Sequence, residues 1–430
     1  TNGILLDNIQ VRLITTGPST GDDSVEVQTQ FIHSWSSIQA KWHFIDVESP
    51  IVDYSWAIGT TRGGTQLQSF TSVGTQTEAI NTDLSMAHGS HVCVTVMARN
   101  AADLIAIATS DRVLIDLTPP IIHEVIDGGD VHDIDFSSDD SSFTFSWSAS
   151  DPESGIDLCQ WTVGSEPGLD DILPGSPSPD ATSSITTSLS QAMVEGQQLF
   201  VTVTCYNHAE QLTWKSSDGV TVVTEPPRSS AATINVKAVS VTQYETRDRY
   251  QSQRDSLKGS WDGFIDPFGI QYYECRLSGP NFFSSWRPCG STSETHLEWS
   301  GFILADDATY SLSVRAINHA GLISQAVGRN FTVESSKPAR GATSLITSST
   351  LGDEMVDLAW DGLFSSPSSL VYEVSLGTIP GGSDIMQWVE TMETGMRVSP
   401  LVPHTDYHLT LTAINAAGLS QTVNKIINDG

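Results

Sequence analysis

The feature that most constrains this chain is an internal repeat that occurs four times. Each copy opens on a tryptophan and closes on an asparagine 55 to 60 residues later: Trp42 and Asn100, Trp147 and Asn207, Trp261 and Asn318, and Trp360 and Asn415. Successive tryptophans lie 99 to 114 residues apart, so the repeating unit has the size of one small domain. A chain of 430 residues therefore holds about four such domains, each large enough to bury its own hydrophobic core.

Within each repeat the apolar residues alternate with a period of two, which is typical of half-buried β-strands. The strand after the first tryptophan places large apolar residues two positions apart, at Tyr54, Trp56 and Ile58. The strand that ends on each asparagine follows the same pattern, and in the fourth copy it reads Tyr407, Leu409, Leu411, Ala413 and Asn415. Because no stretch of useful length carries a 3.6-residue period, we predict an all-β chain with little helix.

The charge and the distribution of apolar residues argue against nucleic acid and membranes as partners. The formal net charge of −31 argues against binding to nucleic acid or to an anionic membrane, because both need clustered lysine and arginine. No apolar run approaches the roughly 18 residues that span a bilayer, so no membrane insertion is expected. The sequence starts without a methionine and without a signal-like segment, and we interpret it as a mature or excised piece of a secreted precursor.

The repeats resemble fibronectin type III and related immunoglobulin-like sandwiches. The resemblance lies in the tryptophan of the second strand, the strand ending in Asn-Ala-Ala-Gly-Leu at 415–419, and the short proline-containing links. More narrowly, Asp-Pro-Glu-Ser-Gly-Ile at 151–156 and Asp-Leu-Thr-Pro-Pro at 116–120 look like repeats of large multidomain extracellular proteins of invertebrates. The resemblance implies four tandem fibronectin-III-like (Ig-like) β-sandwiches. It says little about function, because this fold has many roles.

The repeats define the expected domain limits. We predict sandwiches at 24–118, 119–226, 227–337 and 338–430, preceded by 1–23 as a strand and linker left over from another repeat. The family's tyrosine corner, in which a phenol bonds back to the backbone, would fall at Tyr310 and Tyr407. The first two repeats carry Val92 and Leu199 at this position, so they must close the corner in another way.

Two features suggest contacts between molecules. Ile4, Leu5 and Leu6 look like an exit strand without a preceding domain, while the fourth repeat stops near the close of its last strand. This arrangement favours either head-to-tail assembly by strand addition or a cut that fell there by chance. Cys93 lies one place out of phase with its buried neighbours and is expected to face outward, either pairing between molecules or remaining a semi-buried free thiol.

Five cysteines in a low-charge all-β chain suggest an oxidising compartment. Cys275 and Cys289 flank a strand, a turn and a strand, which predicts a disulfide that staples a hairpin. Cys159 and Cys205 occupy inward positions on strands that are neighbours in the family fold, and are either bonded or simply buried thiols.

Two further sites are suggested by short patterns. Asp127, Asp130, Asp133 and Asp135 crowd the entry to the second repeat, and calcium prefers several such hard oxygen ligands. This acidic loop either holds calcium or is merely solvated, and no other cofactor is indicated. Asn330 begins the sequon Asn-Phe-Thr and is a candidate glycan acceptor on the final strand of the third repeat.

The sequence offers no convincing catalytic site. Gly17-Pro18-Ser19-Thr20-Gly21 matches a nucleophile pattern, but it lies between strands without the helix that this chemistry requires. We therefore predict a secreted structural or adhesive protein that assembles end to end into a fibre or matrix, with copies of itself or matrix and cell-surface proteins as partners. The alternatives are a receptor or adhesion ectodomain that binds a protein ligand, and a carbohydrate-binding accessory region with exposed aromatic residues in a coplanar row.

Overall fold

The computed structural model describes residues 10–14, 30–129, 132–236, 249–280, 282–350, 355–402 and 405–428. Strands dominate these residues, as the alternating apolar pattern predicted, and η2 (Thr343–Leu345) is a short 3₁₀ turn. Buried apolar side chains gather into four separate clusters, one in each repeat. The described part of the chain contains no helix long and apolar enough to cross a membrane.

In the first repeat a three-stranded sheet faces a six-stranded one. The smaller sheet has the order β1 (Gln10–Ile14), β3 (Ile38–His43) and β6 (Glu78–Asn81). The larger has the order β2 (Phe31–Ile32), β9 (Val113–Ile115), β7 (His91–Asn100), β4 (Ile51–Gly59) and β5 (Gln68–Ser72), with β8 (Ile105–Thr109) also paired to β7.

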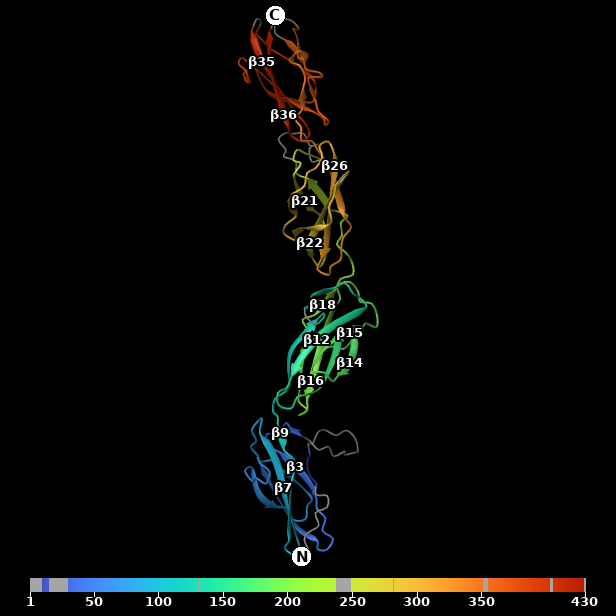
Figure 1. Ribbon diagram of the computed structural model, residues 1–430, viewed down its shortest axis with the longest axis vertical. Helices are drawn as coiled ribbons and strands as arrows, with labels where there is room; N and C mark the ends of the chain where they lie inside the picture. Colours follow the sequence, from blue (N-terminus) through green and yellow to red (C-terminus); the bar gives the residue numbers. More distant parts are fainter. Residues whose placement is uncertain are drawn as a thin grey trace. The chain divides into compact units, whose positions relative to one another are not determined.

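The second repeat has the same strand order. Its three-stranded sheet contains β10 (Ile121–Asp127), β12 (Ser142–Ser150) and β15 (Thr182–Ser188). The opposite sheet contains β11 (Phe136–Ser137), β18 (Val220–Val222), β16 (Gln198–Asn207), β13 (Ile156–Gly164) and β14 (Leu173–Ser178), with β17 (Leu212–Ser216) paired to β16. Figure 1 labels β12, β14, β15, β16 and β18 of this sandwich.

The third repeat has the same main strand order, but its extra strand pairs at a different place in the larger sheet. One sheet contains β19 (Thr233–Val236), β21 (Ser256–Asp262) and β25 (His296–Ser300). The other contains β20 (Tyr250–Gln251), β27 (Val327–Val333), β26 (Thr309–Asn318), β22 (Ile270–Gly279) and β23 (Phe282–Phe283), with β24 (Arg287–Ser291) paired to β22.

The fourth repeat differs in one edge. Its sheets are β29 (Thr347–Thr350), β30 (Val356–Ala359) and β34 (Gly395–Val398), facing β33 (Met386–Thr391), β32 (Val371–Gly377), β35 (Asp406–Ile414) and β36 (Ser420–Asn428). A separate pair, β28 (Ala339–Arg340) and β31 (Phe364–Ser365), lies at the start of this repeat. Three strands facing a larger antiparallel sheet is the strand order of a fibronectin-III-like sandwich, so the fold expected from the resemblance is the fold observed.

The first sandwich begins earlier than the sequence suggested. The sequence pattern predicts residues 1–23 as a segment outside it, but β1 pairs antiparallel with β3 over five residues, from Gln10 opposite His43 to Ile14 opposite Gln39. The alternation in Gln10–Ile14 is that of a first strand rather than of a leftover exit strand. The pairing therefore makes residues 10–14 part of the first sandwich.

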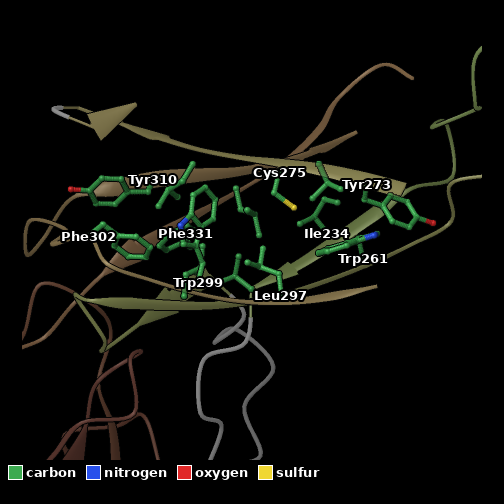
Figure 2. Close-up of a cluster of buried hydrophobic side chains, with 14 of the residues drawn as sticks. Ile234, Trp261, Tyr273, Cys275, Leu297, Trp299, Phe302, Tyr310 and Phe331 are labelled. Carbon is green, nitrogen blue, oxygen red and sulfur yellow. The ribbon is translucent and has the colours of Figure 1, made fainter. Parts of the chain in front are cut away.

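The four tryptophans that mark the repeats lie in the cores. Trp147, Trp261 and Trp360 are among the largest fully buried side chains, and Trp42 is nearly so. Each contacts an aromatic ring of its own repeat at 5.4 to 6.2 Å between centroids. Figure 2 shows this packing in the third repeat, where Trp261, Leu297 and Trp299 extend from one sheet toward side chains of the other.

The tyrosine corner closes as predicted where the tyrosine is present. The Tyr310 hydroxyl accepts the Ala305 N–H at 2.9 Å, and the Tyr407 hydroxyl accepts the Val402 N–H at 2.7 Å. The second repeat, with Leu199 at this position, satisfies the equivalent Val194 N–H through the side-chain oxygen of Gln197 at 3.3 Å. Another side chain thus replaces the phenol.

Candidate functional site

The asparagine that closes the second repeat connects three segments of chain. Asn207 is buried at the end of β16, and its Nδ2 donates to Asp151 Oδ2 at 3.0 Å within the repeat. The same Nδ2 lies 3.1 Å from Asp116 Oδ2 and 3.0 Å from the Thr118 carbonyl, both on the segment that leaves the first repeat. Its Oδ1 accepts the Gln211 N–H at 2.8 Å, which fixes the following turn.

Asp116 is the charged centre of this junction. It follows β9 of the first repeat, and its side chain is fully buried. Oδ2 also accepts the Ser154 hydroxyl at 2.6 Å, and Oδ1 accepts the Thr118 N–H at 3.1 Å. A buried carboxylate is unfavourable unless hydrogen bonds replace its water, and here donors from both repeats supply them. Asp116 therefore links the first two sandwiches by direct side-chain contacts.

The turn after β12 explains why Asp151 can take part. Its Oδ1 accepts the backbone N–H groups of Ser154 at 2.8 Å and Gly155 at 3.0 Å, so this oxygen caps the turn. Gly155 has φ +78°, a conformation that favours glycine. The other oxygen remains available to Asn207, and the motif Asp-Pro-Glu-Ser-Gly thereby builds half of the junction.

The same arrangement recurs in the other repeats, and we call it the asparagine clamp. It consists of the buried asparagine, the turn N–H that donates to its Oδ1, and the oxygens that accept from its Nδ2. Asn318 donates to Asp266 Oδ2 at 3.1 Å and to the Glu225 carbonyl at 3.3 Å. Asn100 donates to Asp46 Oδ2 at 2.8 Å. In every repeat the asparagine Oδ1 accepts an N–H four residues later, at 2.8 or 2.9 Å.

The fourth repeat has lost the aspartate of the clamp. Asn415 donates to the Ser336 carbonyl at 2.9 Å, while Ser368 accepts the Ala416 N–H at 3.0 Å in the region where the other repeats place an aspartate. Thr118, Glu225 and Ser336, whose carbonyls the clamps bind, each lie two residues before a proline. The incoming segment is therefore held at an equivalent backbone position in the second, third and fourth repeats.

Three histidines add to the junction of the first two repeats. His33 Nδ1 lies 2.9 Å from the Ala209 carbonyl, and the Phe31 ring stacks on His208 with 5.9 Å between centroids. His88 Nδ1 accepts the Leu117 N–H at 3.1 Å, so its Nε2 carries the proton and faces Glu153 Oε1 at 3.4 Å. These contacts join residues of both sandwiches around Asp116.

The four asparagines mark the repeats in the sequence, but their hydrogen-bond partners are evident only in the structure. One signal was available: each asparagine continues an inward-facing series of apolar residues, where a polar side chain needs a buried partner. In the first three repeats the partner is a carboxylate far away in sequence, and in the second, third and fourth it includes a carbonyl of the preceding segment. Neither partner is visible from local patterns.

The aspartates expected to bind calcium are only partly brought together. Oxygens of Asp127, Asp133 and a third residue, Asp218, all lie within 4.8 Å of one another. Asp135 is exposed and outside this trio, and Asp130 is not among the described residues. Burial raises the pKa of Asp127 to about 7, and the charges of Asp133 and Asp218 act in the same direction.

Both candidate disulfides are formed in the structure. Cys275 and Cys289 are bonded between the paired strands β22 and β24, with 5.7 Å between Cα atoms. Cys159 and Cys205 are bonded directly across β13 and β16, with 4.1 Å between Cα atoms. The sequence left Cys159 and Cys205 as either a disulfide or two buried thiols, and in the structure they form the disulfide.

Cys93 contradicts its prediction. It is a free thiol on β7, but it is fully buried rather than outward-facing, and burial raises its pKa. It lies opposite Gly59, and the loop after β4 folds back so closely that a Cβ on Gly59 would come 2.4 Å from Gly64. The outer face of the sheet is therefore covered here, and Cys93 is not accessible for pairing between molecules.

Two other predictions concern the edges of the sandwiches. Asn330 lies exposed on β27, opposite Ser311, where a glycan has access to it. Ile4, Leu5 and Leu6, together with the Ser19 pattern, lie outside the described residues.

Proteins that resemble this chain are found among solved structures, at low identity. No family model matches the chain, and no curated protein matches it. Chicken CNTN1 FN1-FN3 domains are 15% identical, with 69% of this chain and 94% of that one covered and a TM-score of 0.30. A tetra-tandem repeat from the extending region of a large adhesion protein is 10% identical, with 98% and 99% covered and a TM-score of 0.29.

A third structure, from a 1.5-MDa bacterial ice-binding adhesin, is 16% identical, with 77% of this chain and 99% of that one covered and a TM-score of 0.35. At such identities and TM-scores these proteins say nothing about what this chain binds. The strand order of its own repeats defines it as a tandem array of fibronectin-III-like sandwiches.

Proposed function

We propose that this chain is an extracellular structural and adhesive array, in which the sandwiches act as spacers held in sequence by asparagine clamps. The observation that carries the proposal is the recurrence of the clamp in all four repeats. At Asn207 and Asn415 the clamp binds the segment that leaves the preceding repeat, so it restricts bending at these two junctions. A fixed junction serves a protein that must hold distance or bear load.

Oxidising surroundings fit the proposal. Two disulfides close loops of 14 and 46 residues in sequence separation, and such bonds persist outside the reducing cytosol. A secreted array is also compatible with the net charge of −31, which keeps separate chains soluble. We therefore place its site of action outside the cell.

End-to-end assembly is the finer part of the proposal. A clamp joins the exit of one sandwich to the entry of the next, which is a heterologous contact and extends without closing. The partner would be a second copy of this chain, with the apolar segment Ile4, Leu5 and Leu6 contributing three side chains to bury at roughly 2 kcal/mol each.

Electron microscopy of the full chain tests the spacer function. Asn207→Ala removes the amide donors at the first junction. The distribution of angles between the first two sandwiches should therefore become broader, while both sandwiches remain folded. Asn235→Ala, at an exposed position on β19, is the matched control and should leave the angles unchanged. An equally broad distribution in the unaltered chain would show that the clamp does not act as a stiffening device.

Deletion of residues 1–8 tests the assembly. Filaments seen with the full chain should disappear, while circular dichroism and both disulfides remain as before. Filaments of unchanged length after the deletion would contradict this route, without bearing on the clamp.

A second candidate function is that of an adhesion ectodomain. Ile105 and Ile107, on β8, expose more than half of their surfaces, and exposed apolar groups on a strand that pairs with β7 alone among the described strands favour a protein ligand. The carbohydrate-binding alternative is less supported, because the exposed tryptophans of the described residues, Trp35, Trp214 and Trp388, stand on three different repeats.

A further inference from the structure

Three aspartates from separate segments meet at one edge of the second sandwich. Asp127 ends β10, Asp133 lies in the crossover from β10 to β11, and Asp218 lies between β17 and β18. One oxygen of each lies within 4.8 Å of the other two. Asp133 Oδ1 accepts the Asp127 N–H at 2.9 Å, and Asp127 Oδ2 accepts the Gly219 N–H at 2.8 Å, so the backbone orients two of the three carboxylates.

The second oxygen of Asp127 has no partner. The side chain is fully buried and accepts hydrogen bonds from the Gly219 N–H and the Ser217 hydroxyl, while Oδ1 has no donor within hydrogen-bond distance. An unsatisfied buried carboxylate oxygen is strongly unfavourable, and two further acids lie beside the Asp127 carboxyl. Burial raises the pKa of Asp127 despite the hydrogen bonds from Ser217 and Gly219, and the charges of Asp133 and Asp218 raise it further.

The position of Asp127 does not call for a carboxylate. Asp127 pairs with Phe145, two residues before the core Trp147. At the same register the first repeat has Leu13, opposite Ala40, and the third has Val236, opposite Gly259. Two sister sandwiches thus place an apolar residue here. Folding of the sandwich does not require the acid, and its presence points to a ligand.

The backbone around Asp218 is shaped for close approach. Gly219 has φ +95°, and a Cβ there would come 2.3 Å from the Phe200 ring. Only glycine therefore lets this turn bring its N–H to Asp127 with Asp218 beside it. The crossover and the turn before β18 are held together at the trio.

We propose that Asp127, Asp133 and Asp218 bind one Ca²⁺ ion at the edge of the second sandwich. An all-oxygen set with three carboxylates suits a hard divalent cation, and Ca²⁺ accepts irregular geometry with water completing its shell. The ion compensates the three charges and satisfies Asp127 Oδ1. It also fastens the crossover between β10 and β11 to the turn before β18. Through this crossover the chain passes from the sheet of β12 to a parallel pairing with β18.

Hydrogen–deuterium exchange of the full chain, measured by mass spectrometry after EDTA treatment and after addition of CaCl₂, tests the site. Peptides covering 121–137 and 212–222 should exchange at least ~10-fold more slowly with Ca²⁺, because binding only to the folded state suppresses local opening. Asp127→Asn and Asp218→Asn should each abolish this response. Asp180→Asn, an exposed acid of the same repeat, should retain it and controls for the loss of one charge.

Asp127→Leu separates a ligand from a structural residue. It supplies the side chain that the first repeat carries at this register, so the sandwich should be protected without Ca²⁺ and should no longer respond to it. The proposal would be overturned if this variant loses protection without metal or if the unaltered chain does not respond to Ca²⁺. It would also be overturned by a response that persists in both asparagine variants, or by a response to MgCl₂ but not to CaCl₂.

Discussion

At the scale of single residues, the buried asparagines do what an apolar side chain at the same position cannot. Each one fixes the turn that follows its strand through Oδ1 and binds a second segment through Nδ2. A primary amide is the smallest side chain that offers an acceptor and two donors together. The strand can therefore end inside the protein without leaving its last polar groups unsatisfied.

Asn100→Ala should destabilise the first sandwich by about 2 kcal/mol. The change leaves the Leu104 and Ala102 N–H groups and one Asp46 oxygen without a partner in a part-buried site, and such losses exceed the value of the hydrogen bonds themselves. Urea unfolding of the full chain, followed at the transition of the first sandwich, measures the effect. Asn235→Ala should change the midpoint little, and an equal shift in both variants would contradict the role of the clamp.

The Asp46 carboxylate gives the clamp a defined dependence on pH. The hydrogen bond from Asn100, followed by the backbone N–H of Ser49, lowers the pKa of Asp46 below its usual value of 3.8. A group whose pKa is lower in the folded state stabilises that state above the unfolded pKa, and the contribution disappears as the pH falls through the folded value. Asp46→Asn should therefore be less stable than the unaltered chain at pH 7, with the difference closing below about pH 4. A difference that stays constant down to pH 2 would show that the charge is not involved.

At the scale of elements, the two disulfides act on different loops. Cys159–Cys205 joins two central strands that already pair, whereas Cys275–Cys289 ties an irregular hairpin in which β23 and β24 both pair with β22. Closing the shorter loop lowers the entropy of the unfolded third repeat.

Replacing both Cys275 and Cys289 by alanine should lower the free energy of unfolding of the third sandwich by roughly 3 kcal/mol. Thermal unfolding with and without the replacements measures this, and a non-reduced digest should show the two peptides joined in the unaltered chain. Recovery of both cysteines alkylated without prior reduction would show that the bond does not form in solution.

Sequence patterns predicted the strands and their inward faces because a period of two is a local property. Trp147 and Trp261 lie in their cores for this reason, and Tyr310 and Tyr407 close their corners. Cys93 was misplaced because alternation tells which face a residue joins, while the loop that covers the outer face is a tertiary feature. Asp218 was missed for a related reason: it meets Asp127 only through the crossing of two strands distant in sequence.

At the scale of the whole molecule, charge opposes association. Chains with a net charge of −31 repel one another at low ionic strength, whereas the clamp contacts act at hydrogen-bond distance. This repulsion affects the junctions within one chain less, because covalent connection keeps the repeats at high effective concentration.

End-to-end assembly should therefore be promoted by salt. Raising NaCl from about 10 mM to about 150 mM shortens the screening length from about 30 Å to about 8 Å, and filaments or larger species should increase. Sedimentation velocity at several chain concentrations measures the distribution. Assembly that is strongest at the lowest salt would indicate attraction between charged patches instead, and would contradict this account.

At two of the junctions a buried acid after the last strand meets a serine of the next repeat. The first repeat carries Asp116 there and meets Ser154, while the third carries Glu334 and meets Ser366. The second repeat has Val223 at this position. The side chains differ in length and in charge, so an exit from one repeat would leave a gap or an unpaired acid on the entry of another. The ends of the repeats are therefore not interchangeable. Exchanging two repeats by recombination should lower the stability of the chain even though all four share one fold.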